Sequence, residues 1–354
     1  MPEDLLVSGR AERVEQLDLA WSSGRYGFII KLRARGRNTQ RDFAPRIHGR
    51  VIARPGDMPH YLGAHTIDKG GIHMAVLRAG NAGMTALQIF TAIPRFYGDK
   101  STIKPERVAR FKAALAKTMI KPANVVVHAA YVLSVATPDD EKWARASAGL
   151  TKELERSSTL GVGSVCFHPG SAGTSDRADS AKRIAKAIVA ALETIDSATR
   201  LLVENTAGAG KTMGKTAQEV GLILSHVPKS LRARTGYGLD TCHLFSSGYD
   251  ITESKQRFTA ILGEFEETTG EPPSFFHLND SEGELGSNRD RHVLIGDGRI
   301  GNQPFEWLME DPRSSGIPLI LETPQQNYDI ADDDDSPDTY DVKMMELLKG
   351  WVRN

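Results

Sequence analysis

Histidines and carboxylates recur at the ends of short apolar segments along this 354-residue chain. One histidine in such a place is more often structural, but six of eight segment ends here carry an imidazole or a carboxylate as a candidate ligand. Carboxylates packed together would repel one another and take up protons, so bound divalent cations are the simplest way to keep them ionised. The candidate ligands are five histidines and four carboxylates: His128, His168, His243, His277, His292, Glu204, Asp240, Asp290 and Glu322.

A separate group is predicted from an Asp-x-His pair, Asp290 and His292. In an extended segment both side chains would point to one side. With His243 they would form a site of two imidazoles and one carboxylate with an open position, which is typical of catalytic zinc. Cys242 is a competing thiolate ligand, and we interpret it instead as an inert buried thiol.

The number of candidate ligands indicates how many metals are bound. One tetrahedral zinc takes three or four protein ligands, so nine ligands predict at least two ions, and three if one carboxylate bridges. Metals roughly 3.5–4 Å apart can clamp the attacking and leaving oxygens of a phosphoryl displacement. Three Zn²⁺ ions would add six positive charges to the net charge of −1 and bring it to +5. The ions themselves could thus supply the positive field that the overall composition lacks.

Eight β-rich runs alternate with segments of helical spacing and would position these residues. Such alternation favours parallel βαβ units, and eight units in roughly 290 residues fit a (β/α)₈ TIM barrel, whose strand ends meet at one mouth. An open doubly wound sheet is the alternative. The predicted strands are 61–67, 86–91, 124–131, 162–169, 200–205, 234–243, 274–280 and 317–323, and the clearest helices are 105–118, 139–160, 180–198 and 216–226.

Composition excludes several classes of protein. No run of 18 apolar residues occurs, and the first 20 residues lack an apolar signal region. We therefore expect no membrane association. The expected location is intracellular and cytoplasmic, either associated with the nucleoid or, in a eukaryote, nuclear. Two cysteines cannot build a disulfide framework. The glycine-rich stretch 208–212 lacks the upstream glycine of a phosphate loop, so no nucleotide cofactor is expected.

Residues 1–58 are predicted to be a basic N-terminal extension, and residues 59–354 the barrel. Positions 25–54 hold nine basic residues against one acid, Asp42. Such a segment is either a solvated extension or an arm that binds polyanions.

Ordered motifs between residues 61 and 324 resemble one family. They include Phe167-His168-Pro169-Gly170-Ser171, Glu204-Asn205-Thr206-Ala207-Gly208, Asp240-Thr241-Cys242-His243, His277-Leu278-Asn279-Asp280-Ser281 and Asp290-Arg291-His292. In these residues the chain resembles the endonuclease IV family of apurinic/apyrimidinic endonucleases (AP endonuclease family 2).

The resemblance implies a trinuclear zinc site in a xylose-isomerase-like TIM barrel. The implied activity is hydrolysis of double-stranded DNA 5′ of abasic sites, leaving a 3′-hydroxyl, with trimming of blocked 3′ ends by a monomer. Glu204 and Glu322 would also serve catalysis, and Glu322 would help orient the attacking hydroxide. The implied ligands are His128, His168 and Glu204 for the first ion; Glu204, Asp240, His277 and Glu322 for the second; and His243, Asp290 and His292 for the third.

Two loops depart from the family pattern. After the second predicted strand, Ile93 offers an apolar wedge beside Arg95. We expect Ile93, Arg95 and Tyr131 to fill the gap left by a flipped abasic nucleotide; the alternative is a loop docked on the barrel surface. After the seventh predicted strand, Glu282 and Glu284 stand where basic residues are common, which should weaken phosphate contacts.

Two other functions compete with this interpretation. A metal-dependent sugar isomerase or epimerase would share the barrel but typically uses a smaller, carboxylate-rich metal set. The group of His243, Asp290 and His292 disfavours it. A non-catalytic binder of damaged DNA would not need an open zinc site.

Overall fold

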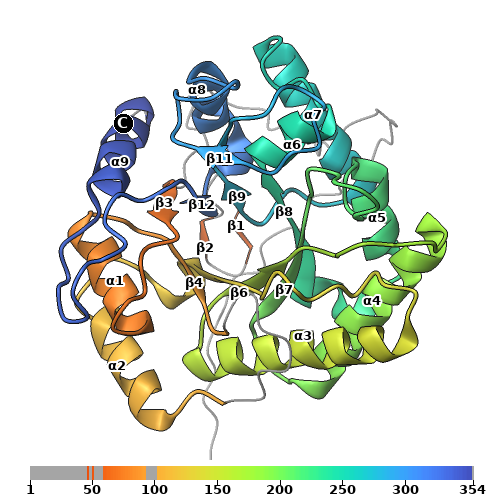
Figure 1. The fold of residues 1–354 in the computed structure, drawn as a ribbon, viewed down its shortest axis with the longest axis horizontal. Coiled ribbons are helices and arrows are strands. Elements are labelled where there is room, and N and C mark those ends of the chain that lie inside the picture. Colours follow the sequence, from red (N-terminus) through yellow and green to blue (C-terminus); the bar gives the residue numbers. More distant parts are fainter. Residues whose placement is uncertain (1–45, 48–49, 52–58, 93–101, 353–354) are drawn as a thin grey trace, which may run out of the picture. The chain divides into compact units, whose positions relative to one another are not determined.

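The structure is a computed structural model that describes residues 46–47, 50–51, 59–92 and 102–352. Eight strands form one parallel sheet in the order β3-β12-β9-β8-β7-β6-β5-β4, with helices around it (Figure 1). They coincide with the eight predicted strands, so the predicted TIM barrel is confirmed and the open doubly wound sheet is wrong. The strands are β3 (Tyr61–Ala64), β4 (Leu87–Phe90), β5 (Val125–His128), β6 (Ser164–Phe167), β7 (Arg200–Glu204), β8 (Thr235–Asp240), β9 (Phe276–His277) and β12 (Pro318–Leu321).

The sheet closes where β3 meets β4. His65 and Gln88 form a parallel bridge there, and the amide of Ala86 donates to the carbonyl of Leu62 at 3.0 Å. Gly63 permits this approach, because a Cβ atom at that position would lie 2.2 Å from the Ala86 carbonyl oxygen. The two strands at the ends of the sheet order, β3 and β4, are thereby joined.

Helices connect the strands, and several begin at a side-chain cap. Asp139 caps α3 by accepting from the amide of Lys142, and Asp176 caps α4 by accepting from Ala178. Because Asp176 supplies this cap, α4 begins three residues earlier than predicted. The helices are α1 (Ile72–Asn81), α2 (Pro105–Leu115), α3 (Asp140–Leu160), α4 (Arg177–Thr194), α5 (Ala217–Ser225), α6 (Thr241–Ser247), α7 (Lys255–Thr269), α8 (Gln303–Glu310) and α9 (Thr339–Trp351). Among the described residues, none of these helices combines the length and apolar character that a membrane span requires.

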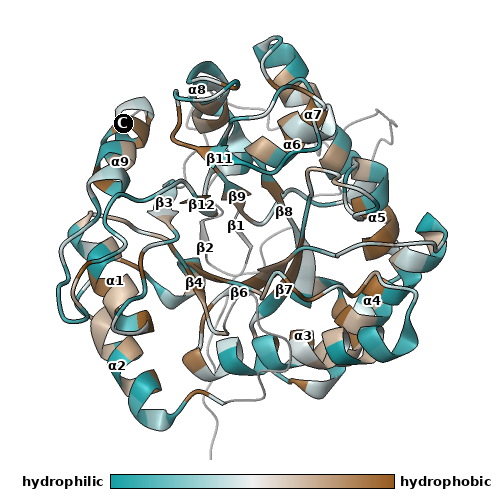
Figure 2. Ribbon diagram, in the orientation of Figure 1, coloured by the Kyte–Doolittle hydropathy of each residue, from teal (hydrophilic) through white to brown (hydrophobic). Residues whose placement is uncertain are grey.

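Two apolar clusters hold the barrel together. Alternate strand residues such as Val125 and Val127 pack outward against the helices, whereas Val126 packs inside the barrel. Much of β4, β6 and β7 is accordingly brown in Figure 2, while the helices carry both apolar and polar residues. The small interior cluster contains Ala86, Val126, Cys166, Leu202, Phe275 and Ile320.

A short hairpin lies in a separate unit, residues 1–52. In it β1 (Arg46–Ile47) pairs antiparallel with β2 (Arg50–Val51). The rest of the predicted basic extension, including Asp42, lies outside the described residues.

Candidate metal centre

The barrel interior leads directly to the candidate ligands. Side chains two residues apart on a strand face the same side. Five candidates follow an interior apolar residue at this spacing: His128 after Val126, His168 after Cys166, Glu204 after Leu202, His277 after Phe275 and Glu322 after Ile320. The structure thus gathers them at the carboxyl ends of the strands, and Asp240 ends β8 beside them.

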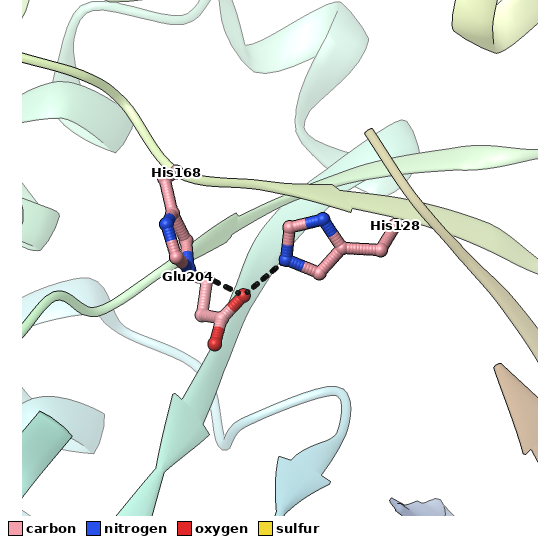
Figure 3. Close-up of side chains that lie close together, drawn as sticks. All are labelled: His128, His168 and Glu204. Carbon is pink, nitrogen blue, oxygen red and sulfur yellow. Dashed lines mark ion pairs between the residues drawn. The ribbon is translucent and has the colours of Figure 1, made fainter. Parts of the chain in front are cut away.

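The first group consists of His128, His168 and Glu204 (Figure 3). The Nε2 atoms of both histidines lie 3.3 Å from Glu204 Oε2. Figure 3 shows the two imidazoles turned toward this carboxylate from neighbouring strands.

The second group shares Glu204 and adds Asp240, His277 and Glu322. His277 Nδ1 lies 2.8 Å from Glu204 Oε1 and 3.2 Å from Glu322 Oε2. Its distance to Asp240 Oδ2 is 3.9 Å. The two oxygens of Glu204 thus face different groups, Oε2 the first and Oε1 the second.

The third group consists of His243, Asp290 and His292. His243 Nε2 lies 3.2 Å from Asp290 Oδ2, and His292 Nε2 lies 2.9 Å from Asp290 Oδ1. His243 was expected in a strand but lies in α6, because the Asp240 side chain accepts from its backbone amide at 2.8 Å and caps that helix. In all three groups the ligand atoms lie within 4.8 Å of one another.

Asp280 holds the loop that carries Asp290 and His292 of the third group. Its buried carboxylate accepts five backbone N–H groups, from Ser281, Gly296, Gly298, Ile300 and Gly301. The loop also pairs back through β11 (His292–Val293) with β10 (Asp280–Ser281). His292 is thereby brought to the mouth of the barrel.

The donor atoms suit a cation. His128 Nε2, Glu204 Oε2 and His243 Nε2 are buried beside other ligand atoms, yet they make no hydrogen bond to any described residue. The other nitrogen of each ring is occupied, since His128 Nδ1 lies 2.7 Å from the Ala129 carbonyl and His243 Nδ1 lies 2.9 Å from the Asn205 carbonyl. Nε2 is therefore left with a free lone pair, as a metal ligand requires.

Electrostatics also favour bound cations. Burial by itself would raise the pKa of Glu204, but the imidazoles of His277 and His168 hold it well below its ordinary value. Burial opposes ionisation of Glu322 as well, and the charge on His277 lowers its pKa to about 2. Burial in turn disfavours protonation of His277, yet Glu204 and Glu322 raise its pKa to about 9. The carboxylates therefore favour positive charge at this site. Protons on the imidazoles supply that charge when no metal is bound, and metal ions would replace these protons.

Two buried asparagines, which were not predicted from the sequence, orient candidate ligands. Asn279 Nδ2 donates to Asp240 Oδ2 at 2.6 Å and to Glu322 Oε2 at 3.3 Å. Asn205 Oδ1 accepts from the Asp240 amide at 2.6 Å. Both lie just after a strand, which was the available signal. Such hydrogen bonds to ligands tune a metal site.

The residues predicted to contact DNA are only partly described. Tyr131 is 49% exposed, and its ring centroid lies 4.8 Å from that of His128. Ile93 and Arg95 lie outside the described residues. Glu282 and Glu284 pair at the surface with Arg289 and Arg299, at 3.7 and 3.2 Å.

Glu153 of α3 binds the two chain segments that contain Thr91 and Ala130, which lie just before Ile93 and Tyr131 in the sequence. It is 1% exposed, accepts a hydrogen bond from Thr91 Oγ1, and pairs with Arg156 at 3.1 Å. Its other oxygen accepts from the Ala130 amide at 3.4 Å. Glu153 was not predicted from the sequence, because a helical glutamate resembles any surface position.

Comparisons with known proteins place the chain among nucleases of one fold. A family model described as a xylose isomerase-like TIM barrel matches residues 76–348. A probable endonuclease 4 from Chloroflexus aggregans is 35% identical over 278 residues, covering 78% of this chain and 94% of the relative. An apurinic-apyrimidinic endonuclease from Caenorhabditis elegans is 34% identical over 269 residues, covering 75% and 67%. The crystal structure of endonuclease IV from Thermus thermophilus matches with a TM-score of 0.68 and 30% identity, covering 83% of this chain and 99% of that one.

Proposed function

Because the chain belongs to the endonuclease IV family within the xylose isomerase-like TIM barrels, we propose that it is a zinc-dependent nuclease that cleaves DNA 5′ of abasic sites. The products would be a 3′-hydroxyl and a 5′ end that carries the abasic sugar. The same centre would remove blocking groups from 3′ ends. The observation that carries this proposal is the convergence of nine ligand side chains in three adjoining groups.

The three groups would hold three zinc ions. Zinc in such a site makes hydroxide available near neutral pH and stabilises charge on the oxygens of phosphoryl transfer. Glu204 would join the first and second groups, since its two oxygens face different histidines. His243, Asp290 and His292 supply only three ligands, which would leave a coordination position for substrate.

The chain's own residues would orient the DNA backbone at this mouth. A cavity of about 230 Å³ opens above the ligands and is lined in part by Tyr131, Arg291 and Glu322. Glu322 reaches both this cavity and the second group, and it would orient the attacking water and accept its hydrogen bond. Ile93, Arg95 and Tyr131 would fill the gap in the DNA stack.

A sugar isomerase or epimerase on the same barrel is the other candidate. Such an enzyme has no need for the third group. His243 and His292 lie nearer to Asp290, at 3.2 and 2.9 Å, than to the carboxylates of the second group, at 3.5 and 3.6 Å, which favours the nuclease.

Incubation with a duplex that contains one synthetic abasic site tests the proposal. We expect a single incision 5′ of the site and a 3′-hydroxyl that a DNA polymerase extends. Chelation should abolish the incision, and added zinc should restore it. A duplex of the same sequence without the abasic site is the control. An abasic duplex that stays uncut, or incision that resists complete metal removal, would contradict the proposed function.

A further inference from the structure

One buried polar side chain of the barrel interior is not among the candidate ligands. Gln88 lies on β4, two residues after Ala86, which belongs to the interior apolar cluster. The spacing is the same as that from Val126 to His128, so Gln88 occupies the layer of the ligands. Its side chain is fully buried and also lies at the bridge to His65 that closes the sheet.

The amide of Gln88 joins two ligands of the second group. Its Oε1 lies 2.7 Å from His277 Nε2, and its Nε2 donates to Glu322 Oε1. The same amide nitrogen lies 3.1 Å from His65 Nδ1. Both polar atoms of the amide are therefore used within the barrel.

The chemistry of Glu322 determines which way this amide points. A carboxylate that binds a metal has only acceptor atoms, so the atom of Gln88 that faces it must be the NH₂ group. The oxygen then faces His277 Nε2, which must carry a hydrogen. His277 Nδ1 is consequently the nitrogen left for a metal, and it is the one that faces Glu204 and Glu322.

His277 differs in this respect from two histidines of the other groups. His128 and His243 are oriented by backbone carbonyls, which substitution of a side chain cannot remove. The orienting acceptor of His277 is a side chain and can be changed without altering any ligand. The NH₂ group that holds Glu322 belongs to the same side chain.

We propose that Gln88 is a positioning residue of the second metal site, which orients His277 and Glu322 through a single amide. This inference rests on the proposed metal centre. Gln88 touches neither substrate nor metal in this role, and acts through the two ligands it holds. Partners of this kind typically change metal affinity by roughly 10–100-fold when they are removed.

Two variants test the hydrogen-bond acceptor and the hydrogen-bond donor of the Gln88 amide. Gln88→Met keeps the size of the side chain and removes both hydrogen-bonding groups. Gln88→Glu keeps an acceptor for His277 but places an oxygen against Glu322 Oε1, where a donor is needed. Asn124→Leu is the matched control, because Asn124 is a buried amide that precedes β5 at the opposite end of the barrel and donates to the Thr85 carbonyl.

Zinc affinity of the full chain is measured by competition with a chromophoric chelator, and the visible spectrum of the cobalt-loaded protein reports ligand geometry. We expect roughly 10–100-fold weaker binding of at least one ion and an altered cobalt spectrum in both Gln88 variants. Asn124→Leu should lower the melting temperature and leave both metal readouts unchanged.

Wild-type affinity and spectrum in Gln88→Met would overturn the inference while leaving the proposed function intact. If that variant does not fold, unchanged metal binding in Gln88→Glu overturns it equally. A wild-type chain that binds no divalent metal would instead refute the metal centre, and this inference with it.

Discussion

Asp280 offers a direct test of how the third ligand group is held. We predict that Asp280→Asn releases the loop of residues 281–301 and thereby the group that contains Asp290 and His292. The substitution keeps the size of the side chain and touches none of the nine candidate ligands. Any loss of metal would therefore come from the loop and not from a missing ligand.

The magnitude follows from the hydrogen bonds of the carboxylate. Oδ2 accepts three backbone N–H groups at 3.0 to 3.2 Å, and Oδ1 accepts two at 2.7 and 2.8 Å. Asparagine has one acceptor oxygen, so at least two of these donors would face its NH₂ group. A buried donor left without a partner costs ~1–3 kcal/mol, which gives ~2–6 kcal/mol for two. Total stabilities are typically ~5–15 kcal/mol, so we expect the loop to open before the barrel unfolds.

Zinc content and limited proteolysis together measure this effect. We expect Asp280→Asn to retain about one zinc fewer than the wild type and to be cleaved within residues 282–301. Asp297→Asn, an exposed change of the same charge in the same loop, is the control and should do neither. Wild-type zinc content with a loss of unfolding free energy below ~1 kcal/mol would refute the reasoning, because the five hydrogen bonds would then not secure the loop.

Three further predictions concern other parts of the chain. Glu204→Ala should lose two zinc ions together, since Glu204 belongs to two groups; elemental analysis that finds three would contradict the bridging assignment. Burial raises the pKa of Asp341 to about 7, so the stability contributed by its protonated form is complete below about pH 4 and is lost as the pH rises through 7. Asp341→Asn should therefore gain stability at pH 8.5, at most roughly 4 kcal/mol, and none at pH 4 in thermal unfolding; equal gains at both pH values would exclude this cause. The double variant Ile93→Gly, Arg95→Ala should bind abasic duplex more weakly in a gel-shift titration, and undiminished affinity would refute a role for these residues in filling the gap.

The sequence was sufficient for the barrel, because regular strand and helix periods reflect local patterns of burial. The strand ends carry their ligands at a spacing of two from interior apolar residues, as His128 follows Val126. The same spacing from Ala86 would also have placed Gln88 in the layer of the ligands. Gln88 was nevertheless not predicted from the sequence, because glutamine is not a usual ligand of zinc and carries no charge.

The sequence by itself determined which side chains point into the barrel, because the alternation of a strand is a local property of the backbone. Only the tertiary structure decided which of them are neighbours, since His277 and Gln88 meet across 189 positions of chain. It also decided which ring nitrogen of His243 and of His277 is free, because the acceptor at the other nitrogen is supplied by a distant part of the chain. The position of His243 in α6 rather than in a strand depends instead on a local contact, because the Asp240 carboxylate accepts from its amide and caps that helix.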